Sequence, residues 1–143
     1  MGENMSFGAA ASVPRGTRPA AGDPCPCGGG AFGACCGPIL AGDAAPTAER
    51  LMRSRYTAFA VGDAQHLRDT WFPATRPATV ALDAATRWRR LEIVATGGEP
   101  GADSATVRFR ASWADERSRR GGVMEEDSRF VRRSGRWYYV DAV

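Results

Sequence analysis

Four cysteines lie within twelve residues of one another, and this cluster constrains the chain more than any other feature of its sequence. They form two pairs, Cys25-Pro-Cys27 and Cys35-Cys36, separated by the glycine-rich stretch GGGAFGA. Zinc binds four thiolates in a tetrahedron at about 2.3 Å each, and glycines let a short loop fold back to bring two pairs together. Four protein thiolates leave no position for water or substrate, so the spacing predicts a structural zinc site.

Three other uses of the cysteines stay open at the level of sequence. Two disulfides satisfy an even count, but Cys25 with Cys27, or Cys35 with Cys36, cannot bridge without strain, and the cytosol is reducing. A redox site lacks both a C-x-x-C spacing and a basic residue between the pairs that would lower a thiol pKa. An iron–sulfur cluster also uses four thiolates, although this spacing is unlike its usual patterns. Zinc is favoured over all three.

The remaining composition is typical of one domain with a tail. A chain of 143 residues that is 43% hydrophobic and 9% aromatic can bury one core, which excludes wholesale disorder. Its 19 basic residues, all of them Arg, exceed its 16 acidic residues by three. Four thiolates and one Zn2+ would reduce the net charge of +3 to about +1, so charge alone is weak evidence for a nucleic-acid partner.

The segment before the cysteines, residues 1–23, is rich in Ala, Gly, Pro and Ser and is predicted to be a disordered leader. It has neither the basic start nor the apolar run of a secretory signal. No part of the chain approaches the roughly 18 consecutive apolar residues of a membrane span. We therefore expect a cytoplasmic protein with no membrane partner, in which a zinc knuckle occupies residues 24–38.

Helical periodicity follows a predicted linker at residues 37–46. Apolar residues recur at helical spacing and predict a helix over residues 47–61. They are Met52, Tyr56, Phe59 and Ala60. Asp63 can cap a second helix that stops before Pro73, which gives a helical hairpin. Residues 80–88 are predicted to form a short third helix.

From Arg90 onward the apolar period changes from that of a helix to the period of 2 that is typical of strands. The clearest strand covers residues 105–113, and residues 123–133 and 136–143 follow as a hairpin. In the strand at residues 105–113, one face is predicted to consist of Ala105, Val107, Phe109, Ala111 and Trp113. Helices followed by an antiparallel sheet define an α+β domain over residues 46–143, with the helices covering one face of the sheet.

Three segments together resemble the YchJ-like family of small bacterial proteins. They are CPC…CCGP, the run LMRSRYTAFAVGDAQHLRDTWFP from Leu51 to Pro73, and the C-terminal SRFVRRSGRWYYVDAV. The resemblance covers the chain from about Pro24 onward. In that family the cysteines form a SEC-C motif, similar to the zinc-binding tail of the translocase ATPase SecA, and the remainder is a nuclear transport factor 2-like domain. The resemblance implies a cone of helices on a curved sheet with a cavity at its mouth, and it implies no particular reaction.

The chain departs from the family pattern in two places. SEC-C motifs usually have one more residue between the cysteine pairs than the seven found here, although flexible glycines can absorb the difference. The family often has T-W-H-P after the second helix, whereas this chain has Phe72 before Pro73. A role that depends on that histidine cannot operate here.

Residues of the globular part that could serve a cavity are few. The only histidine, His66, is predicted to lie at a solvated or edge position with no catalytic role, which argues against Ser-His-Asp hydrolysis. Arg53 and Arg55 lie in the family's L-M-R-S-R-Y block, and one of them is a candidate to bind an anion in the cavity. The alternative is a salt bridge with Glu125, Glu126 or Asp127 of the sheet. Asp141 is a candidate general base if it faces the cavity near a tyrosine. The candidate cavity and anion-binding residues are Arg53, Arg55, Tyr56, Trp71, Arg129, Tyr139 and Asp141.

These observations favour a binding module in which the zinc knuckle docks a protein partner and the cone supplies a scaffold or a small-ligand cavity. The SEC-C resemblance implies a partner in the translation or export machinery. A cavity enzyme of hydrolase or isomerase type is the first alternative. RNA binding is the second, if folding brings together two arginine clusters, at residues 87–90 and 117–120. Loss of zinc is expected to unfold the knuckle while the main domain survives.

Overall fold

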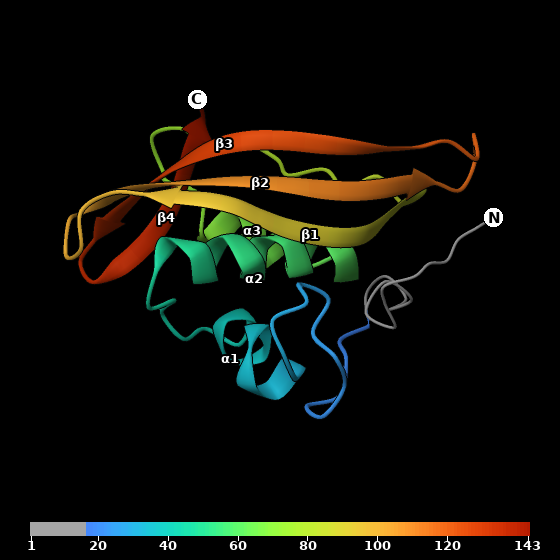
Figure 1. Cartoon of the computed structure of the whole chain (residues 1–143), viewed down its shortest axis with the longest axis horizontal. Coiled ribbons are helices and arrows are strands. Elements are labelled where there is room, and N and C mark those ends of the chain that lie inside the picture. The colour runs from blue at the N-terminus through green and yellow to red at the C-terminus, as the bar shows by residue number, and fades with distance from the viewer. Residues whose placement is uncertain (1–16) are drawn as a thin grey trace.

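The computed structural model describes residues 17–143, so most of the predicted leader lies outside the described residues. Its elements in chain order are a 3-10 helix η2 (Phe32–Ala34), helices α1 (Cys36–Leu40), α2 (Ala48–Val61) and α3 (Ala64–Asp69), and strands β1 (Thr86–Gly97), β2 (Ser104–Asp115), β3 (Gly121–Arg133) and β4 (Arg136–Ala142). Figure 1 shows three layers, with the sheet above, α2 and α3 below it, and the cysteine-bearing segment with α1 beneath α2. The predicted α+β architecture is confirmed.

The four strands form one antiparallel sheet in the order β1-β2-β3-β4. The alternation predicted for β2 is present in the middle of the strand, because Val107, Phe109 and Ala111 are at most 4% exposed, whereas Ala105 and Trp113 at its ends are only half-buried. Phe130 of β3, at 1% exposed, continues the same buried face. Apolar residues two apart thus line the face that the helices cover, as the period of 2 requires.

Helix α2 begins and ends with the residues that the sequence indicates. The Oγ1 atom of Thr47 accepts a hydrogen bond from the backbone N–H of Arg50 at 3.1 Å, which caps the first turn. Gly62 ends the helix with φ 85°, a left-handed conformation that favours glycine. Between these ends α2 contacts the sheet on one side and α1 on the other, so it is the central layer of the molecule.

Two predicted segments differ from the structure. The linker at residues 37–46 contains most of α1, whose Pro38 sits in the first turn, where a helix tolerates proline. Ile39 and Leu40 of this helix are at most 7% exposed, so it is part of the core. The predicted third helix over residues 80–88 is absent from the described chain, because β1 already begins at Thr86 and pairs there with Asp115.

The described end of the predicted leader is also ordered. Backbone N–H groups of Phe32 and Gly33 donate to the carbonyl oxygens of Asp23 and Ala21 at 2.8 and 2.9 Å. Arg18 forms an ion pair with a carboxylate oxygen of Asp63, at the start of α3, at 2.7 Å. The knuckle therefore includes residues before Pro24.

One buried cluster joins the cysteine segment to the rest of the protein. Its members are the four cysteines, Phe32, Ile39, Leu40, Ala45, Ala48, Leu51, Met52, Tyr56, Val61, Leu91, Val107, Phe109, Ala111, Phe130 and Trp137. The predicted units at residues 24–38 and 46–143 thus share a core. Within residues 17–143, no helix has the length and apolarity needed to cross a membrane.

Candidate metal centre

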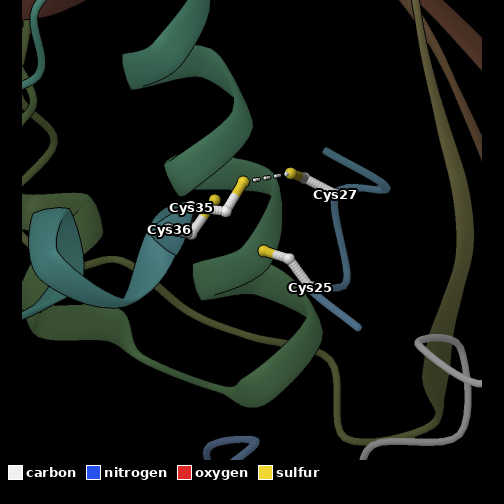
Figure 2. Close-up of side chains that lie close together, drawn as sticks. All are labelled: Cys25, Cys27, Cys35 and Cys36. Atoms are coloured by element: carbon white, nitrogen blue, oxygen red, sulfur yellow. Dashed lines mark hydrogen bonds between the residues drawn. The ribbon is translucent and has the colours of Figure 1, made fainter. Parts of the chain in front are cut away.

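The four cysteine side chains converge on one point. Figure 2 shows Cys25 and Cys27 approaching from the N-terminal loop, and Cys35 and Cys36 from the start of α1. All four sulfur atoms lie within 4.8 Å of one another, and the Sγ atoms of Cys27 and Cys35 are 3.4 Å apart. A tetrahedron of sulfurs at about 2.3 Å from zinc has edges of about 3.8 Å. The donor set therefore fits a metal ion with four thiolate ligands.

The local backbone is shaped for this convergence. Gly29 lies against the cluster, since a Cβ atom there would be 3.0 Å from the Sγ atom of Cys35 and 3.2 Å from that of Cys27. A side chain at this position would enter the space between the sulfurs. Gly28 and Gly30 have φ angles of 82° and 132°, which turn the loop back on itself. The seven-residue spacer is thus long enough to bring both pairs together.

Each cysteine is at most 5% exposed and none is in a disulfide. The disulfide alternative left open by the sequence is therefore wrong for this structure. Adjacent sulfurs cannot pair without strain, whereas the observed arrangement brings all four to one point. Fully buried thiols also lack the exposure that a reactive redox cysteine needs.

The sulfurs share negative charge unevenly. Hydrogen bonds from the thiols of Cys27 and Cys36 lower the pKa of Cys25 to about 2. A hydrogen bond with Cys25 raises the pKa of Cys27 to about 12. Another hydrogen bond with Cys25 raises the pKa of Cys36, and burial raises the pKa of both thiols further. Among Cys25, Cys27 and Cys36, the formation of a second thiolate is therefore opposed. A divalent cation bound by all four sulfurs would remove that opposition.

Helix α2 contacts this centre through three polar side chains that sequence reasoning did not assign to it. The guanidinium of Arg50 donates to the carbonyl oxygen of Cys35 at 3.3 Å, and that of Arg53 donates to the carbonyl oxygen of Cys27 at 3.1 Å. The Oγ1 atom of Thr57 lies 3.7 Å from the Sγ atom of Cys25. Positions 50, 53 and 57 share one helix face. This row of polar residues on a predicted helix is the sequence pattern from which the contact could have been predicted.

Arg55 points the other way, toward the inner face of the sheet. It is 3% exposed, and its Nη1 atom donates to the carbonyl oxygen of Leu67 at 2.9 Å and to Oγ1 of Thr70 at 2.8 Å. Its guanidinium lies 5.0 Å from the ring centre of Trp71 and 4.5 Å from that of Tyr139. Burial lowers the pKa of Arg55 to about 10, so it remains charged at neutral pH.

A carboxylate that the sequence offered only as a salt-bridge partner completes this inner cluster. Glu126 accepts hydrogen bonds from the hydroxyls of Ser128 at 2.6 Å and Tyr139 at 3.0 Å. Its negative charge favours the charged form of Arg55. Burial, followed by the charge of Glu126, raises the pKa of Tyr139. Of the candidate cavity residues, the structure thus brings together Arg55, Trp71 and Tyr139.

The other candidates lie elsewhere. Arg53 pairs with Glu49 on its own helix at 3.0 Å, and Tyr56 is a core residue packed edge-on against Trp88. Arg129 and Asp141 form an exposed ion pair with two bonds of 2.7 Å. That pairing lowers the pKa of Asp141. The suggestion that Asp141 serves as a general base near a tyrosine is therefore corrected.

His66 also differs from its prediction. It is 7% exposed rather than solvated, and its Nε2 atom lies 2.9 Å from the hydroxyl of Ser54. That hydroxyl donates to the carbonyl oxygen of Leu51 at 2.8 Å, which leaves Nε2–H of the neutral imidazole as the donor to Ser54. Burial lowers the pKa of His66 to about 4. The pair joins α3 to α2, and the serine, fully buried, is not placed as a nucleophile.

Helices on one face of a four-stranded antiparallel sheet, with a four-cysteine cluster beneath them, define a nuclear transport factor 2-like protein that carries a SEC-C motif. Residues 47–142 match the family model described as "YchJ, middle NTF2-like domain". A UPF0225 protein of Streptomyces coelicolor is 50% identical over 121 residues, which cover 82% of this chain and 93% of that protein. This chain belongs to the YchJ-like family.

Other relatives and solved structures agree with this assignment. A UPF0225 protein of Sodalis glossinidius is 46% identical over 125 residues, covering 82% of this chain and 81% of that protein. A SEC-C motif containing protein from Rhodopseudomonas palustris superposes with a TM-score of 0.71 at 29% identity, covering 83% of this chain and 96% of that chain. A second such protein, from Psychrobacter arcticus, superposes with a TM-score of 0.64 at 28% identity, covering 78% of this chain and 71% of that chain.

Proposed function

We propose that this chain is a zinc-containing binding module whose knuckle docks a protein partner. The observation that supports the proposal most directly is the set of four buried cysteine sulfurs within 4.8 Å of one another. Four thiolates fill the coordination shell of zinc, so the metal would stabilise the knuckle and leave no position for substrate. Binding, rather than chemistry at the metal, is the use that such a site supports.

The outer side of the knuckle is the proposed docking surface. Residues 28–31, 33 and 34 are exposed, whereas the sulfurs behind them are buried. The metal would thus hold a small exposed loop in one conformation, which lowers the entropy lost when a partner binds. The likeness to the zinc-binding tail of SecA supports a partner in the translation or export machinery.

The test separates metal content from docking. Elemental analysis of protein purified without added zinc is expected to give about one Zn2+ per chain. Co-sedimentation with purified ribosomes, and with purified translocase, then measures docking. Ala34→Arg changes an exposed position of the loop and is expected to retain zinc but lose the partner, while Ala74→Arg, exposed on another loop, is the matched control. Metal-free native protein, or equal sedimentation of both variants, would contradict the proposal.

A second candidate function, RNA binding, is supported by the register of the sheet. Pairing of Arg87 with Ala114 places the first arginine cluster beside the loop that carries Arg117, Arg119 and Arg120. Three carboxylates lie among the six arginines, and Glu116 pairs with Arg87 at 3.0 Å and Asp83 with Arg117 at 3.2 Å. The surface keeps an excess of positive charge, which a phosphate backbone would complement.

Salt dependence tests this candidate. Affinity for a single-stranded RNA of about 20 nucleotides should fall steeply as salt rises from about 50 to 200 mM. The double change of Arg119 and Arg120 to Gln should reduce both the affinity and its salt dependence. Affinity that is equal at both salt concentrations would dismiss RNA binding.

In the part of the chain that the structure describes, the inner cluster has one unpartnered donor that a small ligand could use. Within residues 17–143, the Nε1 atom of Trp71 is a buried donor with no hydrogen-bond partner. Leaving such a donor unsatisfied costs about 1–3 kcal/mol, which a bound acceptor would recover. Asp141, the group suggested as a general base, does not face this cluster, because it forms an exposed ion pair with Arg129.

A further inference from the structure

We propose that helix α2 provides the outer shell of the metal centre, with Thr57 as a hydrogen-bond donor to the Cys25 thiolate and Arg53 as the residue that orients Cys27 and balances its charge. This inference rests on the proposed occupancy of the cysteine site by Zn2+. It assigns roles to residues of the globular domain, which lie 32 and 26 positions away in sequence from the cysteines that they contact.

Thr57 is completely buried, and the Sγ atom of Cys25, at 3.7 Å, is the hydrogen-bond partner that the described structure gives to its hydroxyl. Buried hydroxyls require a partner, and a thiolate sulfur is a better acceptor than a thiol. Donors to ligand atoms fix the orientation of the ligand and tune its electron density toward the metal. A methyl group in place of the hydroxyl would leave Cys25 without this donor.

Arg53 lies on the same side of the cluster as Gly29. A Cβ atom on Gly29 would be 3.6 Å from Nη1 of Arg53 and only 3.2 Å from the sulfur of Cys27. The same Nη1 atom donates to the carbonyl oxygen of Cys27 at 3.1 Å, so the guanidinium holds the backbone of this ligand. Four thiolates around one Zn2+ have a formal charge of −2, and burying it without nearby cations is unfavourable. Arg53 and Arg50 provide two positive charges beside the cysteines, and Arg53 shares its charge with Glu49, whose carboxylate accepts from Nε at 3.0 Å.

The geometry of α2 makes this shell specific. Arg50, Arg53 and Thr57 face the cysteines, while Arg55 on the same helix lies against Trp71 and Tyr139. A rigid helix therefore sets the position of the metal centre relative to the sheet. Metal affinity should depend on side chains that are not ligands.

The Thr57 arm of the test compares Thr57→Val with Thr57→Ser. Zn2+ affinity is measured by competition with a chromophoric chelator, and the thiolate-to-metal absorption band is measured after substitution with Co2+. Removing an outer-shell donor typically weakens metal affinity about 10–100-fold, which is expected for Thr57→Val together with a shifted band. Thr57→Ser keeps the hydroxyl and is expected to restore the wild-type affinity and band. Wild-type values for Thr57→Val would overturn the role of Thr57.

The Arg53 arm compares Arg53→Gln with Arg53→Lys, and Arg108→Gln is the matched control because Arg108 forms an exposed ion pair on the sheet. We expect about a 10-fold loss of Zn2+ affinity for Arg53→Gln, partial recovery for Arg53→Lys and no change for the control. Thermal midpoints are also measured without metal. If a variant lowers the midpoint equally with and without Zn2+, and leaves affinity unchanged, its residue is merely structural and the inference fails.

The outcomes separate this inference from the proposed function. Wild-type protein that takes up no Zn2+ overturns both. Wild-type protein that binds Zn2+, with affinities and spectra unchanged in all α2 variants, overturns the outer shell alone and leaves the zinc module standing.

Discussion

Four successive residues of α2, Arg53-Ser54-Arg55-Tyr56, contact three different parts of the molecule. Arg53 contacts the knuckle, Ser54 contacts α3 through His66, and Arg55 and Tyr56 contact the sheet side. Successive residues of a helix differ by about 100° in direction, so the two arginines had to point apart. The sequence predicted that divergence, but only the packing of α2 between two layers decides which arginine faces which layer.

The environment of His66 makes stability depend on pH. Its folded pKa of about 4 lies below the ordinary value of 6.5, so the folded state binds fewer protons than the unfolded state between these values. The stabilisation from neutral His66 is present above about pH 6.5 and is lost as pH falls toward 4. From pH 7 to pH 5 the free energy of unfolding should fall by about 2 kcal/mol through this residue. Urea unfolding of wild type at a series of pH values measures it.

His66→Gln supplies the comparison for this prediction, since glutamine does not titrate. The unfolding free energy of wild type relative to the variant should fall by about 2 kcal/mol between pH 7 and pH 5. A difference that stays constant from pH 7 to pH 5 would show that His66 is not held neutral by the fold.

At the level of elements, helices and strands with strong periodicity were predictable and those fixed by tertiary contacts were not. Helix α2 and the central strands follow from their own apolar spacing. Helix α1 was missed because its Gly37-Pro38 start is typical of a linker and its five residues form only where Ile39 and Leu40 can be buried. The predicted helix over residues 80–88 competes with pairing of Thr86 to Asp115, and strand pairing prevails.

Sheet register explains why Asp141 was misplaced. Tyr139 and Asp141 are two residues apart and would share a face in a regular strand. The pairing with β3 shifts between Arg129 and Phe130, so Tyr139 lies opposite Phe130 while Asp141 lies opposite Arg129. Such an irregularity changes the face to which later residues point, and nothing in the local sequence predicts it.

The cap of α2 gives a prediction at the same scale. Thr47→Ala removes the acceptor for the N–H of Arg50 and should lower the free energy of unfolding by about 1 kcal/mol. Thr47→Ser keeps a hydroxyl oxygen and is expected to retain most of that stability. Denaturant unfolding of the three proteins provides the measurement, and equal loss in both variants would argue against capping as the cause.

For the whole molecule, the shared core alters what metal removal should do. The sequence predicted that only the knuckle would unfold, but the cysteines pack in one cluster with Leu51 and Met52 of α2. With zinc bound as proposed, its removal would free the cysteine loop and expose that side of α2 to water. The domain should still unfold in one cooperative transition, with its midpoint lowered by more than about 5 °C.

Thermal unfolding followed by tryptophan fluorescence, with and without a strong chelator, measures this change. Cys35→Ser should behave as the chelated wild type does. An unchanged midpoint after complete metal removal would show that residues 24–38 and 46–143 are independent units after all.

The candidate metal ligands could be selected from their spacing, whereas their surroundings could not. Four thiols in a glycine-rich segment have few other uses, so Cys25, Cys27, Cys35 and Cys36 could be selected without a structure. The roles of Arg50 and Thr57 depend on which face of α2 meets the knuckle. That choice is made by burial of the whole core and is not encoded near the cysteines.

Helix α2 packs against both the cysteine segment and the sheet, so the cysteine segment cannot be transferred to another protein by itself. Grafted onto an unrelated host, residues 24–45 would arrive without the helix that buries Ile39 and Leu40 and holds the carbonyls of Cys27 and Cys35. A working chimera would have to include α2 as well, and the host would then carry the central layer of this protein's own architecture.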